Sequence, residues 1–122
     1  HMAHTSLYLW MQAGGTPHNI CVGEWQISRV YALLSNYDSC LFHAKRALHV
    51  CESNGTSVFD LAYAYEALSR AYLVKGNKSE STKYLDLALK AADRVEDQDE
   101  KEILSNDLDK LQNNIRIQFL DE

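Results

Sequence analysis

The sequence predicts an all-α fold in which helix pairs repeat along the chain, and three observations support this prediction. The 122 residues include one proline, Pro17, and five glycines, a composition that favours long helices over many short strands. Apolar residues recur at spacings of three and four, which places them on one face of a helix. The sequence also repeats itself, and the distance from Ser28 to its counterpart Ser69 is typical of stacked helical units. We call this distance the repeat interval.

The internal repeat is clearest in the motif Ser-Arg-x-Tyr. Residues Ser28-Arg29-Val30-Tyr31 align without a gap with Ser69-Arg70-Ala71-Tyr72. The same interval relates Asn36 to Asn77, Ala47 to Ala88 and Leu48 to Leu89. We therefore place the two repeats at about 21–54 and 62–95.

Each repeat is predicted to begin with a long helix. Thr16-Pro17 resembles a helix cap followed by a first-turn proline, and the first helix then ends near Ser35-Asn36. In the second copy, Ser57-x-x-Asp60 predicts a helix start and Gly76-Asn77 a helix end. The intervening helix, about 58–75, is apolar almost all round, so we expect it to be central and flanked by both copies.

The second helix of each repeat has one apolar face. Its members are Leu41, Ala44, Ala47, Leu48 and Cys51 in copy one, and Leu85, Ala88, Leu89, Ala92 and Val95 in copy two. The segment 52–56 between the copies is predicted to be a loop, with Asn54-Gly55 providing the turn.

Two further helices are predicted, one at each end of a single domain that covers residues 3–122. Residues 4–13 form the first, which ends at Gly14-Gly15, and His1-Met2 before it resembles a cloning remnant. Residues 99–117 form the second, an amphipathic helix that would cover the apolar end of a short helical stack. Its apolar positions are Ile103, Leu104, Leu108, Leu111 and Ile115.

Both copies resemble tetratricopeptide repeats. The residues that carry the resemblance in copy two are Tyr65, Leu68, Ser69, Tyr72, Gly76, Asn77, Ser81, Leu85, Ala88 and Leu89. Those in copy one are Ile27, Ser28, Tyr31, Asn36, Tyr37, Cys40, Ala44 and Ala47. The resemblance implies an α-α superhelix whose first helices line a concave groove that binds proteins or peptides.

This sequence departs from the family's pattern at several positions. Glu24 stands where a bulky residue is usual, Ser28 and Ser69 replace the usual glycine, and the proline that often ends a repeat is absent. The repeat interval exceeds the family's roughly 34, a difference that we assign to the loop at 52–58. Two repeats are also fewer than the three or so that such stacks usually need.

The candidate groove residues are Trp25 and Arg29 from copy one, and Tyr63, Glu66 and Arg70 from copy two. Neighbouring first helices pack roughly 10 Å apart, so both arginines should face one surface. Two guanidinium groups beside aromatic rings suit a peptide with an acidic side chain or a free carboxylate. The alternative is that Glu66 pairs with Arg70 four residues on, and that Arg29 pairs with Glu24 or Glu66. The family's clamp for C-terminal carboxylates does not transfer to this chain, because Trp25 and Arg29 are not the lysine and asparagine that the family has at the corresponding positions.

Other functions find less support in the sequence. A net charge of −5 and the absence of a basic run argue against nucleic acid, and no apolar run is long enough to cross a membrane. Three unpaired cysteines suggest buried thiols in the cytoplasm. Although Cys40 and His43 lie one helical turn apart, no known metal-binding or catalytic spacing occurs, so we expect no metal, no cofactor and no enzyme activity.

Three functional hypotheses follow from the sequence. The first is a binding adaptor that uses the groove. The second is a structural homodimer, in which self-association buries an exposed repeat edge. That edge would be formed either by Trp10 or Tyr8, or by the apolar C-terminal residues Ile115, Ile117, Phe119 and Leu120. The third is an enzyme of unrecognised type, which would require an enclosed pocket with perturbed acids.

Overall fold

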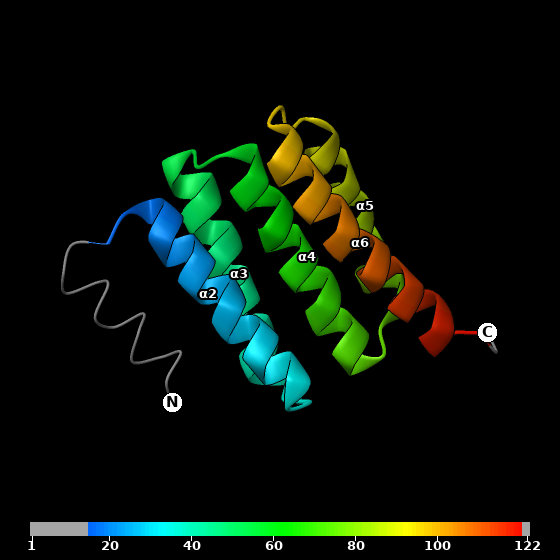
Figure 1. Cartoon of the computed structure of the whole chain (residues 1–122). Helices are drawn as coiled ribbons and strands as arrows, with labels where there is room; N and C mark the ends of the chain where they lie inside the picture. Colours follow the sequence, from blue (N-terminus) through cyan, green and yellow to red (C-terminus); the bar gives the residue numbers. More distant parts are fainter. Residues whose placement is uncertain (1–14, 121–122) are drawn as a thin grey trace.

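The computed structural model describes residues 15–120, and this part of the chain forms an all-helical domain (Figure 1). The five helices within it are α2 (Pro17–Leu33), α3 (Tyr37–Asn54), α4 (Val58–Lys75), α5 (Lys78–Asp93) and α6 (Gln98–Gln118). The predicted N-terminal helix at 4–13 lies outside the described residues. The predicted C-terminal helix is confirmed, with one more residue at each end than expected.

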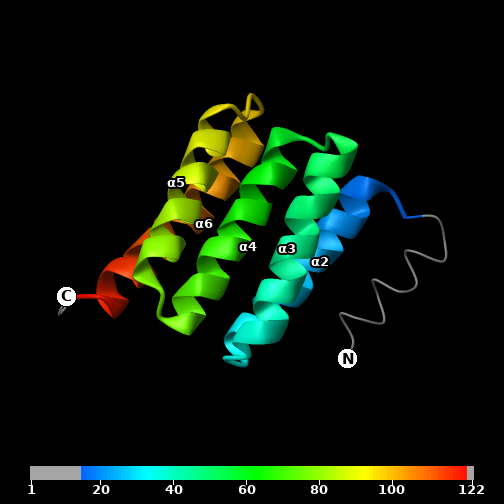
Figure 2. The ribbon, with the colours of Figure 1, turned by 180° about the vertical axis from the view of Figure 1, so that it is seen from behind.

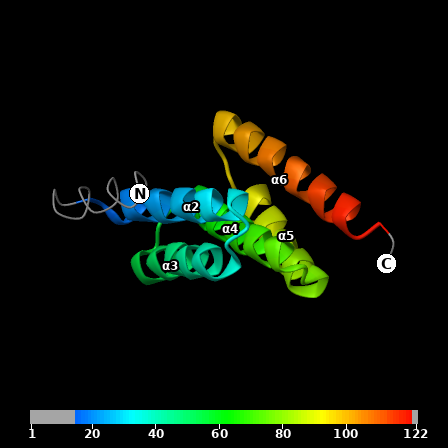
Figure 3. The same cartoon turned by 90° about the horizontal axis from the view of Figure 1, so that it is seen from below.

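Successive helices run in opposite directions and form two antiparallel pairs, α2–α3 and α4–α5, followed by α6 (Figure 1). Helices α2 and α6 lie toward the viewer in Figure 1, whereas α3 and α5 lie on the opposite side, which Figure 2 shows. Seen from below in Figure 3, α4 lies between the α2–α3 pair on one side and α5 and α6 on the other. It packs against all four of the other helices, which confirms the predicted central position.

The repeat interval seen in the sequence is present in the structure at the helix ends. Helices α2 and α4 begin at Pro17 and Val58, and helices α3 and α5 begin at Tyr37 and Lys78. The four caps that precede these helices, Thr16, Asn36, Ser57 and Asn77, each accept a hydrogen bond from the backbone N–H of the helix they open. The predicted Thr16 and Ser57 caps are thus confirmed.

The same interval recurs in the buried contacts between the helices of each pair. The Ser28 hydroxyl donates to the carbonyl of Cys40 at 2.8 Å, and the Ser69 hydroxyl donates to the carbonyl of Ser81 at 2.7 Å. Ring pairs also correspond: Tyr31 stacks on His43 in the first pair, and Tyr72 stacks on Tyr84 in the second, both at 5.7 Å. The two copies therefore share a packing scheme and not only a sequence motif.

The loop predicted at 52–56 is shorter than expected. Helix α3 continues to Asn54, and only Gly55, Thr56 and Ser57 separate it from α4. The assignment of the long repeat interval to an inserted loop is therefore wrong. Helices of 16 to 18 residues in both pairs account for the interval instead.

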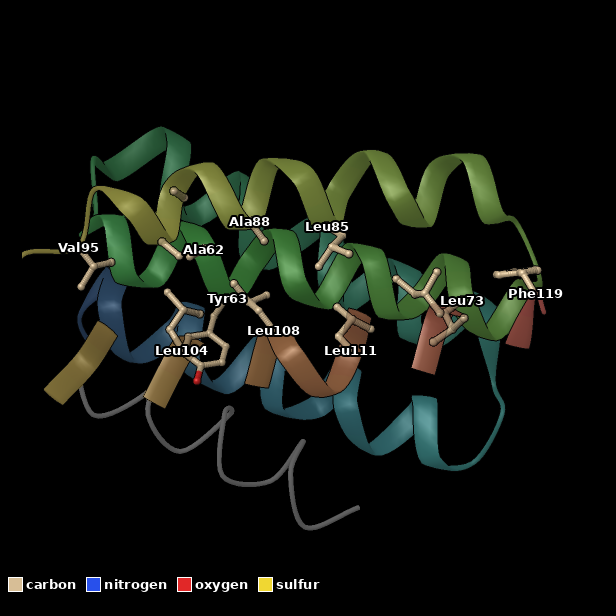
Figure 4. Close-up of a cluster of buried hydrophobic side chains, with 13 residues drawn as sticks. Ala62, Tyr63, Leu73, Leu85, Ala88, Val95, Leu104, Leu108, Leu111 and Phe119 are labelled. Carbon is tan, nitrogen blue, oxygen red and sulfur yellow. The ribbon is translucent and has the colours of Figure 1, made fainter. Parts of the chain in front are cut away.

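The largest apolar cluster lies between α4, α5 and α6 (Figure 4). Leu104, Leu108 and Leu111 of α6 point toward α4 and α5, where they contact side chains that include Leu85 and Ala88 (Figure 4). Burial of this kind stabilises a fold by about 1.5–3 kcal/mol for each large apolar side chain. Helix α6 therefore covers the open apolar face of the second pair, as the sequence predicts.

Two expectations about exposed apolar residues are corrected. Ile103, predicted on the buried face of the C-terminal helix, is more than half exposed. Ile115 and Phe119, predicted at an exposed edge, both belong to the apolar cluster, whereas Ile117 and Leu120 are exposed. Helical rotation explains the split, because Ile115 and Phe119 are four residues apart and share the face of Leu111.

Candidate functional site

The structure brings the five predicted groove residues together between α2 and α4, next to α6. The rings of Trp25 and Tyr63 stack at 4.8 Å between centroids, with 12° between their planes. The Arg29 guanidinium lies over the Trp25 ring at 5.1 Å, a cation–π contact. Aromatic stacking between α2 and α4 thus fixes the position of the first arginine.

Glu66 links the two arginines. Its side chain is 1% exposed, and its Oε2 atom lies 3.5 Å from Nη2 of Arg29 and 3.2 Å from Nε of Arg70. A buried carboxylate is costly unless it is paired and hydrogen-bonded, so Glu66 holds both guanidinium groups at a defined distance from each other. The alternative of internal pairing is therefore realised for both arginines through Glu66.

The other pairing considered for Arg29 does not occur. Glu24 is buried beneath α3, where its Oε2 atom lies 3.2 Å from Nε of Arg46 and 3.0 Å from Nδ1 of His43. A glutamate on the α3 side of α2 cannot reach Arg29, which lies on the α4 side. The sequence could not separate these two options. Glu24 precedes Arg29 by only five residues on the same helix, and Glu66 lies on the helix that packs beside it.

Helix α6 adds a third wall that the sequence did not predict. The Tyr63 hydroxyl donates a hydrogen bond to Oδ2 of Asp107 at 2.5 Å, and the same oxygen lies 4.0 Å from Nη2 of Arg29. Burial raises the pKa of Tyr63, and the hydrogen bond and charge of Asp107 raise it further. A signal for this wall exists in the sequence, since Asp107 follows Glu66 by the repeat interval, although the predicted repeats end near residue 95.

Two adjoining depressions share Arg29, Leu33 and Arg70, and together we call them the arginine groove. The first, about 300 Å³, extends along α2 and α4 to Gln118. The second, about 230 Å³, is bounded on α6 by Asp107, Lys110 and Asn114. Leu33 is 82% exposed at the rim of both, so the groove combines an apolar contact with two cations.

Of the five predicted residues, Arg29 and Arg70 line the arginine groove, whereas Trp25, Tyr63 and Glu66 do not. Arg29 and Arg70 keep 35% and 22% of their side chains exposed and can contact a ligand. Tyr63 and Glu66 are buried, so they support the arginines from behind and offer almost no surface themselves. Because each guanidinium has five N–H donors, pairing with Glu66 leaves donors on both arginines for an external acceptor.

The arginine groove has a small excess of positive charge within an acidic chain. Arg29, Arg70 and Lys110 face Glu66 and Asp107, whereas the chain as a whole carries −5. Such a local reversal of sign favours an anionic group over a cationic one. It also indicates that the interaction would weaken as salt is added.

A second polar contact joins the first turns of α2 and α4. Nδ1 of His18 lies 2.6 Å from Oδ2 of Asp60, whose side chain is buried. Asp60, Glu24 and Glu66 are thus three buried carboxylates, each held by a basic side chain from a neighbouring helix. Charge pairing between helices, in addition to apolar packing, fixes how α2, α3 and α4 are arranged.

No group of three or more His, Cys, Asp or Glu side chains within residues 15–120 is arranged to hold a metal ion. The candidate residues have other partners, since Cys40 contacts Ser28 and His43 contacts Glu24. Over the same part of the chain, no helix is long and apolar enough to cross a membrane. Comparisons of the chain with protein families, with characterised proteins and with solved structures find no match.

Proposed function

We propose that the protein is a peptide-binding module of the tetratricopeptide-repeat type, and that its ligand occupies the arginine groove. The observation that carries the proposal is the position of two partly exposed arginines, from neighbouring helices, beside the exposed Leu33. The groove suits a short peptide segment that places a carboxylate near the arginines and an apolar side chain against Leu33.

Internal pairing alone does not account for this surface. Pairing with Glu66 explains why both arginines are present, but it does not explain why the Leu33 side chain beside them is 82% exposed. Nor does it require Lys110 to add a further cation to the rim. A preformed cationic site with an apolar rim is the arrangement that peptide ligands with acidic residues need.

A displayed library of random peptides with free carboxyl ends would test the proposal. We expect selection on the intact protein to enrich acidic peptides, and Leu33→Asp and Lys110→Glu each to weaken their binding at least tenfold. Leu34→Asp is the matched control, because Leu34 is adjacent and exposed but does not line the groove. No enrichment, or equal binding by all three variants, would overturn the proposal.

A homodimer is the second candidate function, and exposed apolar residues favour it. Val30 and Leu33 lie on α2 and Leu34 directly follows it, while Ile117 lies in the last turn of α6 and Leu120 follows that helix. Sedimentation equilibrium separates the two functions. A monomer whose arginine groove binds acidic peptides supports the first, whereas a dimer that Leu33→Asp converts to a monomer supports the second and assigns the groove to self-association.

A further inference from the structure

Two of the three cysteines meet in the interior of the first helix pair. Cys21 lies near the start of α2 and Cys51 in the last turn of α3, and their Sγ atoms are 2.8 Å apart. Both side chains are buried, at 0% and 4% exposure. The sulfur atoms are already closer than a normal non-bonded contact, and a disulfide bond of about 2.05 Å needs only a small further approach.

The surroundings of the two thiols allow the helices to come together. The other buried members of this cluster are the small residues Ala47 and Ala64, and the two sulfurs contact each other directly. The repeat provides an internal comparison. The positions that the repeat interval assigns to Cys21 and Cys51 are Ala62 and Ala92, both buried, so the second helix pair packs with alanine where the first has thiols.

The two thiols also differ in acidity. A hydrogen bond from Cys21 lowers the pKa of Cys51, so Cys51 is the thiol of the pair that loses its proton more readily. The same contact, together with burial, raises the pKa of Cys21 well above its ordinary value. Such a difference suits one sulfur to react with an oxidant and the other to resolve the product.

The third cysteine lacks this arrangement. Cys40 is buried beside Ser28, whose hydroxyl lies 3.4 Å from its sulfur, and burial raises the pKa of the Cys40 thiol. Its contacts belong to the hydrogen bond that recurs as Ser69 and Ser81 in the second pair. Cys40 is therefore a built-in control for the reactivity of a buried thiol in this fold.

We propose that Cys21 and Cys51 are a site of reversible oxidation, at which hydrogen peroxide converts the two thiols into a disulfide that joins α2 to α3. The Cys51 thiol gives up its proton, the resulting thiolate attacks one peroxide oxygen, and the O–O bond breaks. The departing hydroxide takes up that proton, so that sulfenic acid and one water form. The Cys21 sulfur then attacks the Cys51 sulfur, and the S–O bond breaks. Hydroxide leaves and takes the Cys21 proton as water. One peroxide is reduced to two waters in all, and two thiols are oxidised to one disulfide.

The position of Cys51 determines how peroxide reaches its sulfur and how a disulfide would change the stability of the fold. Its carbonyl accepts the backbone N–H groups of Gly55 and Thr56, so opening the last turn of α3 exposes the sulfur to a molecule close in size to water. The disulfide would then link two residues 30 positions apart and restrict the unfolded chain. We expect the oxidised protein to have a higher melting temperature than the reduced protein.

The test is peroxide treatment of the intact reduced protein, followed by alkylation of free thiols in denaturant and mass analysis. We expect one alkylated cysteine, Cys40, and a proteolytic peptide in which Cys21 is linked to Cys51. A reductant should restore three alkylated cysteines. Far-UV circular dichroism should give a higher melting temperature for the oxidised form.

Matched variants follow from the second repeat. Cys21→Ala and Cys51→Ala each reproduce a residue that the second helix pair has at the corresponding position, and neither should form an intramolecular disulfide. Cys40→Ser, which reproduces Ser81, should form it as the wild type does. Three alkylated cysteines after peroxide, a disulfide that includes Cys40, or an oxidised form that melts no higher than the reduced form would overturn the proposal.

Discussion

Glu66 is the residue on which the arrangement of the arginine groove depends most. It is buried on the central helix, and both arginines bond to one of its oxygens. Removing its charge leaves Arg29 and Arg70 close to each other without the anion between them. Breaking a fully buried ion pair costs about 3–5 kcal/mol, and partial exposure of both arginines reduces that cost here.

We therefore expect Glu66→Gln to lower the free energy of unfolding by about 2 kcal/mol, measured by urea denaturation. Glu80→Gln is the control, since Glu80 lies 3.9 Å from Lys83 in an exposed pair on α5. Such pairs contribute less than about 1 kcal/mol. Equal effects of the two substitutions would contradict the role assigned to Glu66.

Tyr63 makes the stability of the fold depend on alkaline pH. Its pKa is raised in the folded protein, mainly by burial and then by Asp107. Below about pH 10 the phenol is protonated in both states and its full contribution is present. Above that pH the unfolded chain loses the proton first, so this contribution is lost at up to about 1.4 kcal/mol for each pH unit.

Tyr63→Phe should isolate this effect. At pH 7 the variant lacks the hydrogen bond to Asp107 and should be less stable than the wild type by about 1 kcal/mol. As the pH rises above about 10, the difference should shrink, because only the wild type ionises at this position. Tyr65 and Tyr72 have raised pKa values in both proteins and cancel in the comparison. Parallel curves of unfolding free energy against pH would contradict the assignment.

At the scale of the elements, the turn that joins the helices of each pair places equivalent residues in the same left-handed backbone conformation. Ser35 has φ of 55° and Gly76 has φ of 84°, and the repeat interval relates the two positions. A left-handed backbone favours glycine, since a side chain costs roughly 1 kcal/mol there. The first turn therefore carries a residue that the second turn avoids.

The two turns predict opposite effects of exchanging these residues. Ser35→Gly should stabilise the protein by about 0.5–1 kcal/mol, and Gly76→Ser should destabilise it by about 1 kcal/mol. Open space surrounds the Gly76 Cα, so backbone conformation and not a steric clash decides the sign. Urea denaturation of both variants measures the effect, and changes of the same sign would rule out this explanation.

Helix boundaries could be predicted from the sequence because local residues set them. Thr16, Pro17 and Ser57 specify helix starts through their own side chains, and they predict the first residues of α2 and α4 to within one residue. Residues 52–56 are predicted as a loop, but α3 continues to Asn54, because only Gly55 takes the left-handed backbone that ends the helix. The local residues therefore predicted that a turn is present, but not the residue at which α3 ends.

Contacts between helices were only partly predictable. The repeat interval placed Arg29 beside Glu66 and Arg70, because equivalent first helices must pack side by side. The contact of Tyr63 with Asp107 depends on how α6 is seated, and that of Cys21 with Cys51 depends on the register of α2 against α3. Neither register is specified by a local motif, so neither contact was predicted, although the repeat interval from Glu66 to Asp107 was a signal for the first.

At the scale of the whole molecule, α6 decides whether two helix pairs make a stable domain. Four of its side chains and that of its C-cap residue enter the apolar cluster that it shares with α4 and α5, namely Leu104, Leu108, Leu111, Ile115 and Phe119. At about 2 kcal/mol each they contribute on the order of 10 kcal/mol. A domain is stable by about 5–15 kcal/mol in total, so this contribution is comparable to all of it.

A chain that ends at Glu96 should therefore lose its cooperative thermal transition, as followed by far-UV circular dichroism. The control is Leu108→Ala in the intact chain, which should melt at a lower temperature but still cooperatively, because it costs about 2–5 kcal/mol. A synthetic peptide of residues 97–120, added to the truncated chain, should restore helical signal and the transition together. If the truncated chain unfolds cooperatively near the wild-type temperature, the two helix pairs are stable without α6, and α6 serves only to form one side of the arginine groove.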